Sequence, residues 1–261
     1  MSEGDPADVI ELVRRRRGVL GALESGEARK EDLVDRLDVS RSTVDRGVQD
    51  LTRHGLVERG ASGYRLTLAG RLVFDEYRRF RRRIDGVVGN VHVLSLLAPD
   101  VPLQTAVLDA ATVVTADKHA PYRPAAHVAD IVDRATHVRA FASALVPKHV
   151  DTYRERIVEE GLSAEFVLTD EVVELLVASH ADALRESLAT GSVEMRRVDE
   201  ALPFGLVVAD TPDGAEMGMV LYADSSARAF VGNDTPDAIA WAWETVTDVW
   251  DRGEPISFEV D

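Results

Sequence analysis

The sequence predicts a mixed α/β fold with two domains joined by a helical segment, and three observations support this prediction. The first 70 residues combine apolar positions at helical spacing with a short hairpin pattern. Apolar residues then recur at alternating steps of four and three between residues 73 and 98. From residue 137 onward, strand patterns alternate with helix patterns and then follow one another as hairpins. We therefore expect three parts: residues 1–70, 71–98 and 99–261.

The composition excludes several kinds of site and concentrates positive charge at one end. The 261 residues contain no cysteine, which excludes a disulfide, a thiolate metal site and a cysteine nucleophile. The formal net charge is −16, to which residues 1–85 contribute +2 and residues 86–261 contribute −18. Only the N-terminal third can therefore approach phosphate groups without strong repulsion.

The acidic surface is also poor in lysine, since arginine supplies all basic residues except Lys30, Lys118 and Lys148. Such a surface is typical of a halophilic protein, and molar salt weakens any binding that depends on the release of counterions from phosphate groups. The N-terminal stretch MSEGDPAD lacks the apolar core of a secretory signal, and no apolar run approaches the roughly 20 residues that cross a bilayer. We therefore expect a cytoplasmic location.

Residues 6–24 are predicted to form an amphipathic helix with Pro6 in its first turn. Residues 14–17 of this helix are four consecutive arginines, which are either a solvated face or phosphate contacts. Its apolar stripe consists of Val9, Leu12, Val13, Val19, Leu20 and Leu23.

Two short helices follow, separated by the tight connection 38–40. Ser40 has the chemistry of an N-cap, because its hydroxyl can accept a hydrogen bond from the first turn. The apolar positions Leu33, Val34 and Leu37 of the first helix, and Val44, Val48 and Leu51 of the second, are spaced to face inward. The opposite face of the second helix carries Arg41, Ser42, Thr43, Arg46, Gln49, Asp50 and Arg53.

Two short strands complete this unit, residues 56–59 and 64–66, joined by the Gly-rich turn 60–63. Helix, turn, helix and hairpin together form a winged helix-turn-helix, whose second helix fits the major groove of DNA. The alternative is a helical pair with a solvated polar face. Serine and threonine beside arginine favour DNA binding, because a merely solvated face is more typically filled with better helix formers.

The segment after the hairpin is predicted to be a long helix that Thr67 caps. Gly86 and Gly89 weaken this helix, and a basic stripe lies on it at residues 78–83. The helix either pairs two copies of the chain or packs on its own second domain, and we favour dimerisation. Its heptad seam consists of Val73, Tyr77, Phe80, Ile84, Val87, Val91, Leu94 and Ala98.

The remaining chain is predicted to form a mixed α/β domain after a proline-rich entry, residues 99–124. The expected strands are 112–116, 137–145, 163–169, 193–198, 204–210, 216–222 and 228–231. The expected helices are 125–135, 148–160, 171–189 and 236–252, the last of which carries all three tryptophans.

No catalytic or metal-binding pattern is found in this domain, and we expect no cofactor. Two segments could nevertheless hold an effector. His119, Tyr122 and Arg123 lie between prolines and could bind an anion or a polyhydroxyl compound, although a rigid structural turn is the simpler interpretation. Phe204 precedes Gly205, which would allow a ligand or another backbone to come close to the strand.

The segments VSRSTVDR, YRLTLAG, HAPYRP, LPFGL and NDTPDAIAWA resemble haloarchaeal winged helix-turn-helix regulators. The C-terminal part of those regulators belongs to the methanogenesis-regulator middle-domain family. The resemblance covers nearly the whole chain and implies an archaeal transcription regulator. Through the related TrmB-type regulators, it also implies a phospholipase-D-like α/β fold that senses a signal. The catalytic His-x-Lys-x4-Asp pattern of that enzyme fold is absent, so we expect no enzymatic activity.

Together these features predict a homodimeric transcription regulator whose partners are double-stranded DNA, a second copy of the chain and an unidentified effector. The alternatives are a winged module that binds protein and, with less support, a phosphodiesterase-like enzyme. Base edges would be contacted by Ser42, Thr43, Arg46 and Gln49, and phosphates by Ser40, Arg41 and Arg53. The hairpin would contact a flanking groove or phosphate through Arg59, Ser62 and Arg65.

Overall fold

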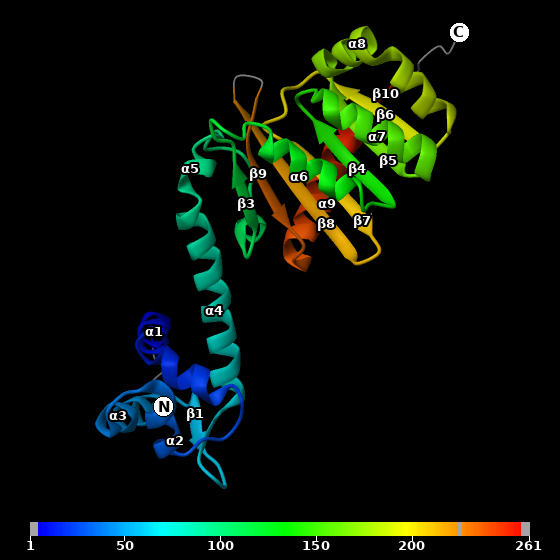
Figure 1. The fold of residues 1–261 in the computed structure, drawn as a ribbon. Helices are drawn as coiled ribbons and strands as arrows, with labels where there is room; N and C mark the ends of the chain where they lie inside the picture. The colour runs from blue at the N-terminus through cyan, green and yellow to red at the C-terminus, as the bar shows by residue number, and fades with distance from the viewer. Residues whose placement is uncertain (1–4, 224–225, 257–261) are drawn as a thin grey trace. The chain divides into compact units, whose positions relative to one another are not determined.

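The computed structural model describes residues 5–223 and 226–256, and the chain divides into two compact units (Figure 1). The first unit is Met1–Arg82 and the second is Arg83–Asp261. Each unit has a hydrophobic core of its own. The boundary falls inside helix α4 (Leu68–Gly89), within the segment that the sequence marks as the link between domains.

The N-terminal unit consists of three helices and a two-stranded hairpin, the arrangement of a winged helix-turn-helix. Its elements are α1 (Pro6–Leu23), α2 (Lys30–Leu37), α3 (Arg41–Arg53), β1 (Val57–Arg59) and β2 (Tyr64–Leu66). The apolar positions predicted to face inward make up most of its core, with Leu12, Val13, Leu20, Leu33, Val44, Val48 and Leu51 all buried.

Helix α4 begins as expected, because the Gly70 amide donates a 2.9 Å hydrogen bond to the Thr67 hydroxyl. The predicted helix does not run unbroken to Ala98, because α4 ends at Gly89, one of the two glycines expected to weaken it, and a separate short helix, α5 (Val91–Leu94), follows. Asn90 between them is non-helical, and its side-chain amide donates to the Gly86 carbonyl at 2.8 Å. Gly86 and Gly89 both favour the helix less than other residues do. Because they weaken its last turn, the hydrogen bond from the Asn90 side chain to the Gly86 carbonyl is able to end the helix here.

The second unit is built on an eight-stranded mixed sheet in the order β10-β6-β5-β4-β7-β8-β9-β3. Strands β4, β5 and β6 are parallel, and the other pairings are antiparallel. The mixed α/β class predicted from the alternating patterns is therefore confirmed. The strands are β3 (Thr112–Thr115), β4 (His137–Ala142), β5 (Ser163–Thr169), β6 (Val193–Val198), β7 (Gly205–Thr211), β8 (Gly214–Ala223), β9 (Ser226–Asn233) and β10 (Glu254–Pro255).

Helices cover both faces of this sheet (Figure 1). On one face lie α9 (Pro236–Arg252) and the 3-10 turn η1 (Thr105–Leu108), and on the other lie α6 (Arg123–Val132), α7 (Pro147–Glu160) and α8 (Asp170–Ala189). Successive residues of β7 point to opposite faces, so Leu206 and Val208 join the α9 side while Val207 and Ala209 join the other. The turn η1 and strand β10 are elements that the sequence patterns did not predict.

Candidate nucleic-acid interface

Helix α3 is held to its own unit by one face and exposes the other. Ser40 caps it as predicted, since the Thr43 amide donates a 3.3 Å hydrogen bond to the Ser40 hydroxyl. The buried face consists of Val44, Gly47, Val48 and Leu51. An alanine at Gly47 would place its Cβ 3.3 Å from a methyl group of Val19, so the glycine permits a close crossing of α3 with α1.

The exposed face presents every α3 side chain that the sequence predicts for DNA contact: Ser40, Arg41, Ser42, Thr43, Arg46, Gln49 and Arg53. All seven side chains are therefore accessible to solvent along α3 and its cap. Arg46 donates from Nε to the Ser42 carbonyl at 3.2 Å. Its two terminal nitrogens have no other partner within residues 5–223 and 226–256, so they are free to bind an acceptor.

The two carboxylates of α3 are neutralised by neighbouring elements, which removes repulsion toward phosphates. Lys30 of α2 lies 2.6 Å from Asp45, and this hydrogen bond lowers the pKa of Asp45 and raises that of Lys30. Arg16 of α1 lies 2.8 Å from Asp50, and Arg53 lies 3.5 Å from the other oxygen of the same carboxylate. Each of these acids is thus paired with a cation.

The predicted arginine run at residues 14–17 is therefore divided between two roles. Arg16 connects α1 to α3 through Asp50. Arg14 lies 2.7 Å from Glu11 on the same helix, and Arg17 donates to the Arg14 carbonyl at 3.1 Å. Only Arg16 thus serves to position α3.

The hairpin is tied to the loop before α2, which fixes the wing. Glu27 accepts hydrogen bonds from the Ser62 hydroxyl at 2.6 Å and from the Ser62 amide at 2.8 Å. The Ser62 hydroxyl is the main reason that the pKa of Glu27 is lowered. Ala28 and Tyr64 exchange backbone hydrogen bonds of 3.0 and 2.9 Å, which adds a bridge to the hairpin. Glu27 has no local signal in the sequence, because its partner is 35 residues away.

The three wing residues predicted to contact DNA are all exposed, but they differ in availability. Arg59 has no side-chain partner among the described residues. Arg65 lies 2.8 Å from Glu58, and the Ser62 hydroxyl is directed to Glu27. Arg59 is consequently the wing side chain best placed to bind a phosphate.

The structure does not bring the four predicted effector residues together. Phe204 is buried in the core between Phe141 and Trp241, at centroid distances of 5.5 and 6.2 Å. Tyr122 is 81% exposed, and Arg123 begins α6. The His119 segment is a turn in which the Asp117 carboxylate accepts a hydrogen bond from the His119 amide at 2.7 Å. This agrees with the simpler interpretation of the segment as a rigid structural turn.

Gly205 fits the expectation of a close approach, because the ring of Tyr222 lies over it. A Cβ at Gly205 would be 3.3 Å from a ring carbon of Tyr222 and 3.4 Å from its hydroxyl oxygen. In residues 5–223 and 226–256, no group of three or more histidine, aspartate or glutamate side chains could hold a metal ion. No helix in that part of the chain is long and apolar enough to span a membrane.

Two protein families match parts of the chain in sequence. Residues 121–252 match the middle domain of the methanogenesis regulatory protein FilR1. Residues 5–87 match the HVO_A0261 N-terminal domain. No curated protein sequence matches the chain significantly.

Three solved structures show limited similarity to this chain, each at low sequence identity. TrmBL2, described as an archaeal chromatin protein with a novel mode of DNA binding, is 14% identical with a TM-score of 0.44, over 97% of this chain and 100% of its own. Nuc, a phospholipase D family member from Salmonella typhimurium, is 16% identical with a TM-score of 0.40, over 57% of this chain and 99% of its own. NucT from Helicobacter pylori is 7% identical with a TM-score of 0.39, over 56% and 98% of the two chains.

Proposed function

The chain belongs to the family defined by the middle domain of the methanogenesis regulatory protein FilR1, and we propose that it is a sequence-specific DNA-binding transcription regulator. The observation that supports this function best is the exposed polar face of α3, where Arg46 and six other side chains able to hydrogen-bond face solvent and the terminal nitrogens of Arg46 have no partner among the described residues. The acids of that helix are already paired with Lys30 and Arg16. A surface of this kind can meet both phosphates and base edges.

Each side chain of the interface has a role that follows from its chemistry. Arg46 can bond a guanine bidentately and Gln49 an adenine, while Ser42 and Thr43 can bond either kind of base. Ser40, Arg41 and Arg53 would hold phosphates beside the groove, and Arg59 would do so from the wing. Ser62 and Arg65 would contact the same phosphates, and they also stabilise the hairpin through their contacts with Glu27 and Glu58.

Replacing Arg46 by alanine is expected to weaken specific DNA binding by about 1–3 kcal/mol and to relax base preference at one position of the site. The reason is that the exposed face of α3 loses a guanidinium whose terminal donors have no partner among the described residues. The measurement is footprinting and fluorescence anisotropy on sequences selected from genomic fragments. Arg185→Ala, on the exposed surface of α8, is the matched control and should leave binding unchanged. An unaltered footprint with Arg46→Ala would remove this residue from base readout.

We further propose that the chain acts as a homodimer, because an apolar stripe that overlaps the predicted seam, and to which Val88 also contributes, is left uncovered. Val73 and Tyr77 pack on the N-terminal core, whereas Val87 and Leu94 pack on the core of the second unit. Ile84, Val88 and Val91 remain exposed at 42%, 66% and 59%. Ile84 and Val88 of α4, together with Val91 at the start of α5, form exposed apolar surface that a second copy of the chain could bury.

Val88→Glu is expected to convert the dimer to monomers and to weaken binding to a two-half-site DNA at least tenfold, since each half-site would bind alone. The side chain is exposed, so the substitution should not unfold the second unit. Sedimentation velocity measures the oligomeric state directly. The control is Arg79→Glu, on the same helix but outside the seam. A wild-type chain that sediments as a monomer at micromolar concentration would contradict the dimer.

The second unit would serve as an effector-sensing domain that shifts the dimer between two geometries with different affinity for DNA. We assign it no catalytic role. An assay for phosphodiesterase activity tests that assignment, and turnover by the purified chain would refute it.

A further inference from the structure

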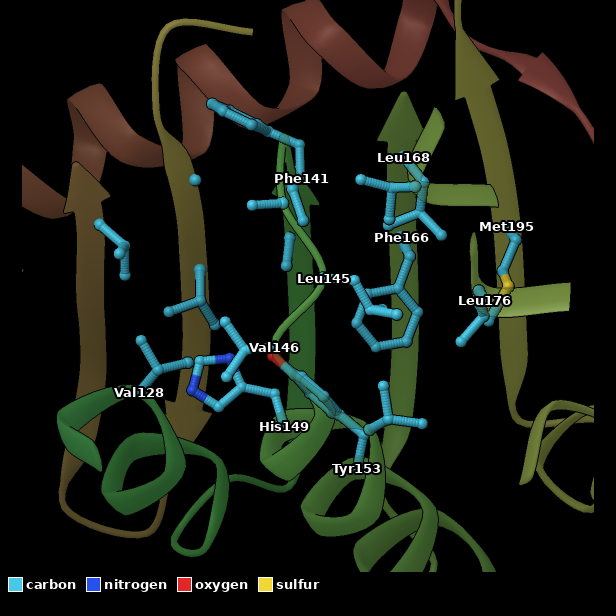
Figure 2. A pocket seen from close by; sticks show the side chains of 18 of the residues that line it. Val128, Phe141, Leu145, Val146, His149, Tyr153, Phe166, Leu168, Leu176 and Met195 are labelled. Atoms are coloured by element: carbon cyan, nitrogen blue, oxygen red, sulfur yellow. The ribbon is translucent and has the colours of Figure 1, made fainter. Parts of the chain in front are cut away.

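An apolar cavity lies inside the second unit, between the sheet and the helices that cover one of its faces (Figure 2). Its volume is about 130 Å³. Strands β4, β5, β6, β7 and β8 supply one wall, and α6, α7 and α8 supply the other. Among the side chains that point into it are those of Val128, Leu145, Phe166, Leu168, Leu176 and Met195.

Two tyrosine hydroxyls belong to this cavity and lack hydrogen-bond partners. The Tyr153 ring packs edge-on against Phe166, 4.8 Å between centroids, and its hydroxyl extends into the cavity (Figure 2). Tyr222 lies across from it, over Gly205. Neither hydroxyl has a hydrogen-bond partner within residues 5–223 and 226–256. Both tyrosines are half-buried, and a hydroxyl that borders an apolar cavity gains a hydrogen bond when a ligand with an acceptor oxygen enters, so both are suited to bind such a ligand.

The protonation states of the lining groups determine which ligands fit. Burial raises the pKa of Tyr153, and it raises the pKa of Tyr222 to about 12, so both phenols stay neutral and can donate. Burial lowers the pKa of His149, whose Nε2 is 2.7 Å from the Ala125 carbonyl. The histidine is therefore neutral, with its proton on Nε2. Arg154, the one cation of the lining, is 2.6 Å from Glu186.

The backbone of α8 is shaped around the same cavity. The helix is interrupted at His180, where φ is −138° and ψ is 31°. Leu176 lines the cavity before the break, and Ala183, Leu184 and Ser187 line it after the break. Residues on both sides of the break therefore line the same wall, as their helical spacing requires.

We propose that this cavity binds an uncharged, mainly apolar small molecule that carries one oxygen able to accept a hydrogen bond from Tyr153 or Tyr222. A cavity of about 150 Å³ holds a benzene ring, so a single ring or a short aliphatic chain is the appropriate size. A carboxylate is disfavoured because the lining offers no unpaired cation. The idea that such a ligand regulates DNA binding rests on the proposed function. Binding of the ligand to the cavity does not depend on that function.

Acetophenone is a suitable probe, with ethylbenzene as its oxygen-free counterpart and benzoate as its charged one. The full chain, labelled with ¹³C at methionine methyl groups, contains its own controls. Met195 lines the cavity, whereas Met217 and Met219 belong to the core on the opposite face of the sheet. Acetophenone is expected to shift the Met195 signal and leave the other two in place, and it should bind at least tenfold more tightly than benzoate. Equal shifts at all three methionines, no shift at Met195 up to the solubility limit, or equal binding of benzoate would overturn the proposal.

Two sets of variants separate the hydroxyls from the walls. The double variant Tyr153→Phe, Tyr222→Phe is expected to lower acetophenone affinity about tenfold, because it removes both donors, and to leave ethylbenzene affinity unchanged. Equal loss for both probes would argue against a role for the hydroxyls. Ala183→Leu should abolish binding by filling the space, while Ala178→Leu, exposed on the same helix, should not. Retained affinity in Ala183→Leu would also overturn the assignment.

These measurements contain no DNA, so their outcome is independent of whether α3 binds a duplex. A chain that binds acetophenone but no DNA would refute the proposed function and support the cavity. A chain that binds DNA but no probe would support the proposed function and refute the proposed ligand site.

Discussion

Gly70→Ala is expected to destabilise the N-terminal unit by about 3 kcal/mol, the upper part of the range for overpacking. Gly70 is buried in the first turn of α4, and a Cβ there would overlap the carbonyl oxygen of Leu56 and lie 2.8 Å from the carbonyl carbon. The obstacle is backbone and cannot rotate away. The same carbonyl accepts a 3.1 Å hydrogen bond from the Thr67 amide, which resists displacement.

Helix propensity alone predicts the opposite sign, because alanine is about 1 kcal/mol better than glycine inside a helix. The experiment therefore decides between local propensity and tertiary packing. All three tryptophans lie in α9, so their fluorescence follows the second unit, and hydrogen exchange of α3 amides follows the first. We expect faster α3 exchange with unchanged tryptophan fluorescence. The control is Gly89→Ala, where a Cβ meets no atom within 4 Å. Undiminished protection in Gly70→Ala would show that the junction can relax.

Asn233→Asp is expected to destabilise the second unit by about 3 kcal/mol or more. The side-chain nitrogen of Asn233 donates toward the carbonyls of Ala106, Val107 and Asp109, at 3.4, 3.1 and 2.9 Å. Its oxygen accepts from the Thr235 amide at 2.8 Å, just before α9 begins. A carboxylate has the same shape but cannot donate, so a buried charge would face three carbonyl oxygens.

The measurement is chemical denaturation of the full chain followed by tryptophan fluorescence, because η1 and α9 both depend on this amide. Asn90→Asp is the matched control. Its amide makes one hydrogen bond, to Gly86, in a half-buried position, so we expect a cost of about 1 kcal/mol. A similar loss of unfolding free energy in the two variants would mean that the Asn233 amide does not hold the turn η1 in place.

Much of the fold was predictable because its signals are local. Ser40 and Thr67 mark helix starts by their hydroxyls, and both accept the hydrogen bonds that this role requires. Period-two and period-3.6 apolar patterns placed the sheet strands and covering helices of the second unit within a few residues. The exposed face of α3 followed from the same periodicity, since burial of Val44 and Val48 directs Arg46 to solvent.

The α4 seam and the effector residues were less predictable, because both depend on which surfaces meet in space. Val87 fits a heptad seam, yet it packs against the core of its own unit. Phe204 was grouped with His119 as a site residue, but its ring is a core contact of Trp241. Tyr153 stands in an unremarkable helical pattern, and only the sheet behind α7 makes it a cavity residue.

The order of residues by itself determined the class of each segment, the caps and the side chains that α3 presents, because hydrogen bonding and apolar periodicity act between near neighbours along the chain. Tertiary structure alone decided the pairing of Asp45 with Lys30, the anchoring of the wing by Glu27, the lack of room at Gly70 and the cavity beside Tyr153. Each of these joins segments far apart in sequence, where packing and charge pairing depend on distances that no local pattern specifies.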